Sequence, residues 1–140
     1  MCGCRNEWGQ ILTDGNPDQL RSLSELVWRN TRQPLKTNGQ MTAREWAQAA
    51  SGRRLRWEVI GSILAMTGLT AANLSGWDTI FDSIRDRYVD RATFAERMRR
   101  ASGYCLCFCY ESEVLNDVYI TFMYGKTQAL HYPSPFGVVC

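Results

Sequence analysis

The chain has 140 residues, of which 45% are hydrophobic and 21% are charged, a composition typical of one globular domain and not of a disordered segment. Sixteen basic and 14 acidic residues leave a formal net charge of +2, which is too small to indicate a nucleic-acid or anionic-membrane partner. Met1 is followed by polar residues rather than by an apolar run, so we expect no signal peptide. The six cysteines are therefore expected to be free thiols in a reducing compartment.

The first predicted helix begins at Asn16-Pro17, where an N-cap residue precedes a proline suited to the first helical position. Its apolar residues recur at helical spacing up to Val27, and the polar segment 30–34 ends it. Thr42 and Glu45 then form a capping box, which predicts a short second helix that Ser51-Gly52 closes.

A longer helix is predicted to begin near Arg54 and to end at a capping glycine, Gly68. The most apolar stretch, Val59 to Ala72, is roughly 14 residues long, whereas a membrane span needs about 20, so we expect a core helix and no membrane partner. Three further amphipathic patterns follow. They predict helices over Trp77 to Arg87, from Asp90 or Thr93 towards Cys109, and from near Ser112 to Tyr124.

These patterns predict an all-α fold, a helical array of about six helices. We expect residues 1–15 to be a flexible N-terminal segment and residues 16–130 to be the helical region. Residues 131–140 are expected to be an irregular tail, because Pro133 and Pro135 cannot continue a helix.

Cysteine and histidine are the candidates for metal binding or catalysis. Within a helix, Cys105 and Cys109 share a face while Cys107 points nearly to the opposite side, so the three cannot hold one ion. His131 is the only histidine, and no third group is placed to form a catalytic constellation with it and a cysteine. We therefore expect no enzyme activity, no metal site and no cofactor, and we interpret the thiols as small buried hydrophobes.

The start of the long helix carries an unusual cluster of arginine, tryptophan and glutamate. Arg53 or Arg54 lies four or five residues before Glu58 and is placed to pair with it. Arg56 is placed to stack on Trp46 or Trp57. Two interpretations stay open, a structural clamp between two helices and a ligand site, of which the clamp is favoured.

This cluster belongs to a longer pattern, W-x5-G-x2-LRWE-x2-G, which comprises Trp46, Gly52, Leu55, Arg56, Trp57, Glu58 and Gly61. The pattern resembles the signature of the fungal-specific transcription factor domain, which is also called the middle homology region of zinc binuclear cluster regulators. Further matches occur in the expected order, so that the resemblance extends over residues 18 to 124. They are Asn30-Thr31, Pro34-Leu35, Arg91, Phe94-Ala95, Met98, Ala101, Cys105-Leu106, Phe108-Cys109 and Asn116-Asp117.

The resemblance implies an all-α regulatory domain of a nuclear DNA-binding protein that contacts protein partners or effectors and has no catalytic residues. In such regulators, an N-terminal cluster of six cysteines holds two zinc ions and reads the DNA. Cys2 and Cys4 begin a motif of that kind which does not continue. We therefore expect no zinc in this chain, and DNA contact only through a cluster that this chain lacks.

The family's helices continue past the position of Asn116-Asp117, whereas this chain passes into Gly125-Lys126 and a proline-containing end. We therefore expect a fragment, an incomplete part of a larger α-helical domain, whose partners are other proteins or the remaining helices of the parent regulator. The edge where those helices would pack is expected to expose Tyr119, Phe122, Met123 and Tyr124.

The alternative interpretation is a small-molecule-binding helical domain. Trp46, Trp57 and Trp77 occur together with several arginines, and aromatic residues with one charged group commonly line ligand pockets. This alternative predicts an enclosed pocket that is lined by these three tryptophans.

Overall fold

The computed structural model describes residues 16–36, 38–74, 79 and 90–130. All regular structure in these residues is helical, which confirms the predicted all-α fold. The described elements are α2 (Pro17–Thr31), α3 (Ala43–Ala49), the short 3-10 helix η1 (Gly52–Arg54), α4 (Trp57–Asn73), α6 (Arg91–Glu111) and α7 (Asp117–Leu130). The predicted N-terminal segment, the helix over Trp77 to Arg87 and the tail lie outside the described residues, so the expected number of helices stays a prediction.

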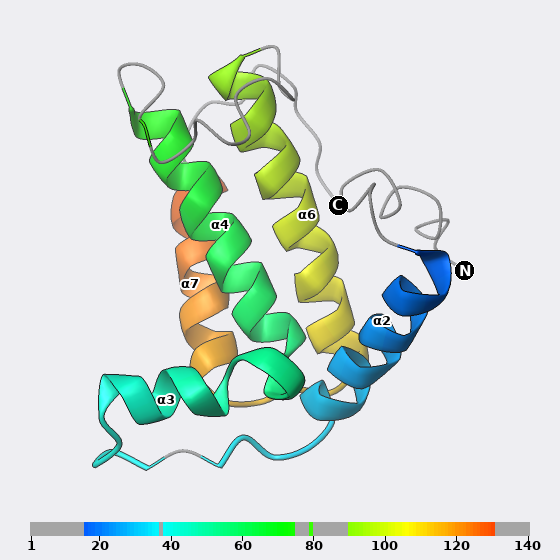
Figure 1. The fold of residues 1–140 in the computed structure, drawn as a ribbon. Helices are drawn as coiled ribbons and strands as arrows, with labels where there is room; N and C mark the ends of the chain where they lie inside the picture. The colour runs from blue at the N-terminus through cyan, green and yellow to red at the C-terminus, as the bar shows by residue number, and fades with distance from the viewer. Residues whose placement is uncertain (1–15, 37, 75–78, 80–89, 131–140) are drawn as a thin grey trace.

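Helix α4 occupies the centre of the described structure. α4 and α6 run antiparallel side by side and share the most extensive helix contact, while α7 lies along a second side of α4 (Figure 1). α3 crosses below the N-terminal end of α4, and α2 packs obliquely near the same end (Figure 1). The N-terminal end of α4 is therefore the place where α2, η1 and α7 come within reach of one another.

The sequence of α4 explains its central position. Glu58 is the only charged residue in its 17 residues, so nearly all of its surface can be buried without desolvating charge. Gly61 and Gly68 lie seven residues apart, which places them on one face two turns apart. That face is the one along which neighbouring helices approach most closely.

Gly68 does not end α4, so the prediction that it caps the helix is wrong. The helix continues to Asn73, and the position of a Cβ added to Gly68 would lie 3.0 Å from Met98 Cβ and 3.1 Å from the carbonyl oxygen of Ala95. Gly68 is thus a packing glycine that lets α6 approach. The glycine that does adopt a left-handed conformation is Gly52, with a φ of 57°, and it ends the α3 region as predicted.

Capping residues set the starts of three helices. Asn16 accepts a hydrogen bond from the Asp18 backbone before Pro17, and Thr42 and Glu45 form the predicted capping box. Asp90, one of the two predicted candidates, caps α6 by accepting from the Thr93 backbone. These local signals place the starts of α2 and α3 from the sequence and leave two candidates for the start of α6.

Two clusters of buried side chains form the core. The larger one lies around the N-terminal half of α4 and the smaller one around its C-terminal half. The larger cluster contains Val27, Trp57, Cys105, Cys109, Val114, Tyr119 and Phe122, and the smaller one contains Ala71, Phe94 and Met98.

No described helix has the combination of length and hydropathy that crossing a bilayer requires.

The predicted apolar edge on α7 is only half exposed. Tyr119 and Phe122 are buried in the larger cluster, because the helical repeat turns them towards α4. Met123 and Tyr124 are exposed as predicted, together with Ile120.

The close contact at Gly61 gives a stability prediction. A methyl group at Gly61 would overlap the Phe122 ring and lie 2.9 Å from Cys105 Cβ, and both residues are buried. Gly61→Ala is therefore expected to lower the free energy of unfolding by about 1–3 kcal/mol, measured by urea denaturation.

Gly125→Ala in α7 is the matched control, because a Cβ there meets nothing within 4 Å. This variant is expected to gain about 0.5–1 kcal/mol from helix propensity. A gain in both variants would contradict the close packing at Gly61.

Candidate functional site

A fully buried ion pair lies at the N-terminal end of α4. Arg56 Nε donates to Glu58 Oε1 at 2.5 Å, and the side chains are 6% and 0% exposed. Taking both charges out of water is costly, and only close pairing with further hydrogen bonds compensates for it. The other hydrogen-bond partners of the pair therefore determine which parts of the chain must lie at this end of α4.

The ion pair is tied to α2 through Thr31, the last residue of that helix. Arg56 Nη2 donates to the Thr31 carbonyl oxygen at 2.9 Å, and the Trp57 backbone N–H donates to Thr31 Oγ1 at 2.9 Å. The N-cap residue of α4, Arg56, makes no side-chain capping bond. The Thr31 hydroxyl therefore satisfies an orphan N–H at the start of α4 from a different helix.

The same ion pair is tied to α7 through Asn116. Asn116 Nδ2 donates to Glu58 Oε1 at 3.0 Å, while its Oδ1 accepts from the Tyr119 backbone N–H at 2.9 Å. Asn116 thus caps the first turn of α7 and binds the carboxylate with one amide group. The last helix was predicted to begin near Ser112, which is wrong: Ser112 caps the end of α6, and α7 begins after Asn116.

Asn30 completes the set by holding the segment between η1 and α4. Its Nδ2 donates to the carbonyl oxygens of Arg53 and Leu55 at 2.8 and 3.0 Å. We refer to Asn30, Thr31, Arg56, Glu58 and Asn116 as the Arg56–Glu58 network. It joins the C-terminal end of α2, the N-terminal end of α4 and the N-terminal end of α7.

The structure changes the predicted partner of Glu58. Glu58 pairs with Arg56 rather than with Arg53 or Arg54, which are exposed. The reason is that Arg56 is an extended N-cap residue, with φ −136° and ψ 154°, so the four-residue spacing rule for helix surfaces does not apply to it.

The other residues of the predicted signature surround the network without all joining it. Trp57 is 8% exposed and packs on Phe108 with ring centroids 4.8 Å apart, and Trp28 meets the same ring edge-on at 5.9 Å. Leu55 packs against the larger core cluster, and Gly61 admits Phe122. Trp46 lies on α3 with 38% of its surface exposed.

The cysteines of α6 follow the predicted helical geometry. Cys105 and Cys109 are fully buried, whereas Cys107 is exposed. Burial raises the pKa of the Cys109 thiol, and the nearby charge of Glu58 raises it further, against the opposing effect of Arg56. A thiol of this kind is held protonated and packs as a small apolar group. Within the described residues, no group of three or more potential ligands is placed to hold a metal ion, and His131 lies outside them.

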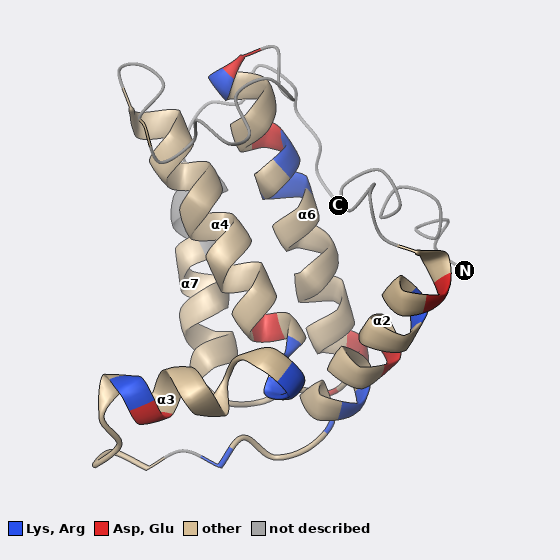
Figure 2. Cartoon of the chain, in the orientation of Figure 1, with Lys and Arg blue, Asp and Glu red and all other residues tan. Residues whose placement is uncertain are grey.

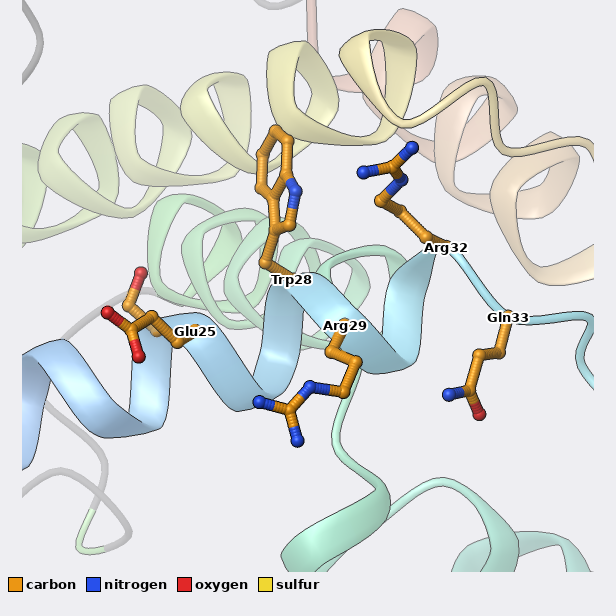
Figure 3. Close-up of a pocket in the computed structure, with 6 residues that line it drawn as sticks. Glu25, Trp28, Arg29, Arg32 and Gln33 are labelled. Atoms are coloured by element: carbon orange, nitrogen blue, oxygen red, sulfur yellow. The ribbon is translucent and has the colours of Figure 1, made fainter.

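A shallow hollow of about 540 Å³ lies along α2, as Figure 3 shows. Its lining consists of Ser24, Glu25, Trp28, Arg29, Arg32 and Gln33. Neither Trp46 nor Trp57 contributes to it, and Trp77 lies outside the described residues. The enclosed pocket around three tryptophans therefore gains no support from this hollow.

Asn116 and Thr31 were not singled out by reasoning from residue chemistry, although both belong to the resemblance. Asn116 is a residue type preferred at the N-cap, and it directly precedes the apolar pattern of the last helix. That is the signal by which the sequence could have indicated its role. Comparison of the chain with protein-family models, curated proteins and solved structures gave no match.

The buried pair and a partly exposed pair in the same chain allow a direct comparison. Glu58→Ala leaves the Arg56 charge buried without its partner, so we expect the free energy of unfolding to fall by about 3–5 kcal/mol. Glu96→Ala breaks the Glu96–Arg99 pair, whose side chains are 29% and 20% exposed, and is expected to cost no more than about 1 kcal/mol. Urea denaturation measures both values. Equal losses would contradict the claim that burial makes loss of the Arg56–Glu58 pair more costly to stability than loss of the Glu96–Arg99 pair.

Proposed function

We propose that this chain is part of the regulatory domain of a fungal zinc-cluster transcription factor and that it acts by binding, not by catalysis. The observation that supports this is that three segments of the resemblance lie together in the structure. Asn30-Thr31, the Arg56 to Glu58 segment and Asn116 are brought together by hydrogen bonds that bridge 25 and 58 residues of sequence. A chance match to the pattern gives no reason for these segments to meet.

In this proposal, the Arg56–Glu58 network holds the helices in one arrangement so that their outer faces can bind. The outward side chains of α4 and α7 include Ile63, Met66, Ile120, Met123 and Tyr124, all exposed by more than 40%. The described outer surfaces of both helices are also nearly free of charge (Figure 2). Exposed apolar side chains that gather on one face of a protein are typical of contacts with other proteins.

The proposed partners are other proteins or the remaining helices of the parent regulator, and the proposed location is the nucleus. DNA contact would belong to a zinc cluster elsewhere in that regulator, with no zinc held by this chain. The genomic sequence on both sides of the reading frame tests this part. We expect a six-cysteine cluster upstream and further helical sequence downstream, and unrelated flanks would contradict it.

A reporter assay tests regulation itself. The chain is inserted between a heterologous DNA-binding domain and a strong activation segment, and transcription of a reporter gene is measured in yeast. We expect the insertion to lower reporter output several-fold, because the proposed domain restrains activation. Glu58→Ala should restore output through loss of the folded arrangement, whereas Glu96→Ala should leave the restraint in place. Unchanged output with the unaltered chain, at equal protein level, would contradict the proposal.

A further inference from the structure

Positive charge is concentrated in one part of the described chain. Residues 29 to 54 contain six basic residues and one acidic residue, Glu45, which gives a local charge of +5 in a chain of net charge +2. The six are all exposed: Arg29, Arg32, Lys36, Arg44, Arg53 and Arg54. In Figure 2, blue segments, which mark Lys and Arg, occur at the C-terminal end of α2, on η1 and on α3. The rest of the chain is correspondingly acidic.

Four of these arginines lie where the C-terminal end of α2 meets η1, and we call them the α2–η1 basic surface: Arg29, Arg32, Arg53 and Arg54. Arg29 and Arg32 lie in the last turn of α2 and at its C-cap. The Asn30 side chain holds the Arg53 carbonyl oxygen at 2.8 Å, which brings η1 against the end of α2. No carboxylate among the described residues forms an ion pair with any of the four, and all four residues are exposed.

The hollow on α2 adds an apolar contact beside these charges. Trp28 lies in its wall and is held by its edge-on contact with Phe108. Figure 3 shows Trp28 and Arg32 projecting to the same side of α2. A ligand in the hollow therefore meets an aromatic ring and a guanidinium group together, the combination that recurs at protein interface hot spots.

We propose that the α2–η1 basic surface and the adjoining hollow bind an acidic peptide segment that carries an apolar side chain. Carboxylates of the peptide would pair with the planar guanidinium groups. Its apolar side chain would pack on Trp28. This inference rests on the charges and the hollow alone and is independent of the proposed transcriptional role.

A peptide fits this surface better than a nucleic acid does. Glu25 and Gln33 line the same hollow as Arg29 and Arg32, and a phosphate backbone, which offers acceptors only, would be repelled by the Glu25 carboxylate. A peptide supplies backbone N–H donors for Glu25 as well as carboxylates for the arginines. The residues that line the hollow all come from α2 and the two positions that follow it.

The test uses the full chain and fluorescence anisotropy. The probe is a short fluorescein-labelled peptide of alternating Asp and Leu with one Phe. One competitor is a peptide of equal length with Asn in place of every Asp, and the other is a single-stranded DNA oligonucleotide of equal charge. We expect the acidic peptide to bind, with an affinity that falls as salt is raised, and both competitors to bind at least roughly tenfold more weakly.

Matched variants locate the contact. Arg29→Gln/Arg32→Gln removes two charges from the surface and should weaken peptide binding by roughly tenfold or more. Arg21→Gln/Arg44→Gln removes two exposed charges outside it and should change binding by less than about twofold. Circular dichroism confirms that both double variants keep the helical fold.

Three results would overturn the proposal. They are no binding of the acidic peptide, equal binding of the oligonucleotide or of the neutral peptide, and equal weakening by the two double variants.

Discussion

The buried pairing of Arg56 with Glu58 is the interaction on which the rest of the described structure depends. The Glu58 side chain has no exposed surface, and a buried carboxylate is tolerated only where it is paired. Its Oε1 accepts hydrogen bonds from Arg56 and Asn116, which come from separate parts of the chain, and its Oε2 is buried without a hydrogen-bond partner among the described residues. Arg56 also donates to the Thr31 carbonyl oxygen at the end of α2, and Asn116 lies at the start of α7. The hydrogen bonds of Glu58 and of its partner Arg56 therefore connect three helix ends.

The network acts together with close packing along α4. Gly61 lets Phe122 and Cys105 lie against the helix backbone, one turn beyond Glu58. Phe122 lies on α7, whose position the network already constrains, whereas Cys105 lies on α6, which this close packing holds against α4. The polar contacts set which helices meet, and the apolar contacts supply most of the stabilisation. The thiols of Cys105 and Cys109 lie within the larger core cluster and belong to these apolar contacts.

Features of the fold that depend on neighbours in sequence could be predicted from the sequence. Asn16-Pro17, the Thr42–Glu45 capping box and the opposite faces of Cys105 and Cys107 all depend on helix geometry over a few residues, and the structure has each of them. The partner of Glu58 could not be found in this way. Arg56 precedes the helix in an extended conformation, so helix spacing gave Arg53 or Arg54 instead. Asn116 is 58 residues from Glu58, and no periodicity in the sequence connects them.

The role of Gly68 also could not be predicted from its neighbours in the sequence. A glycine near the end of an apolar stretch suits a helix cap and a helix-packing contact equally well, and only the approach of α6 decides between them. The signature around Trp46 to Gly61 had the opposite character, because its ordered matches named Asn30-Thr31 and Asn116 without any physical reason. In the structure these residues lie in one hydrogen-bonded network.

A double-mutant cycle on Arg56 and Asn116 tests most directly whether these residues form one network. Both side chains donate to the same oxygen, Glu58 Oε1, and they belong to different parts of the fold. Arg56→Met, Asn116→Ala and the double variant are compared by urea denaturation. We expect the losses to be non-additive, with a coupling free energy above about 0.5 kcal/mol. Losses that add within that margin would contradict the claim that one buried carboxylate links these helix ends.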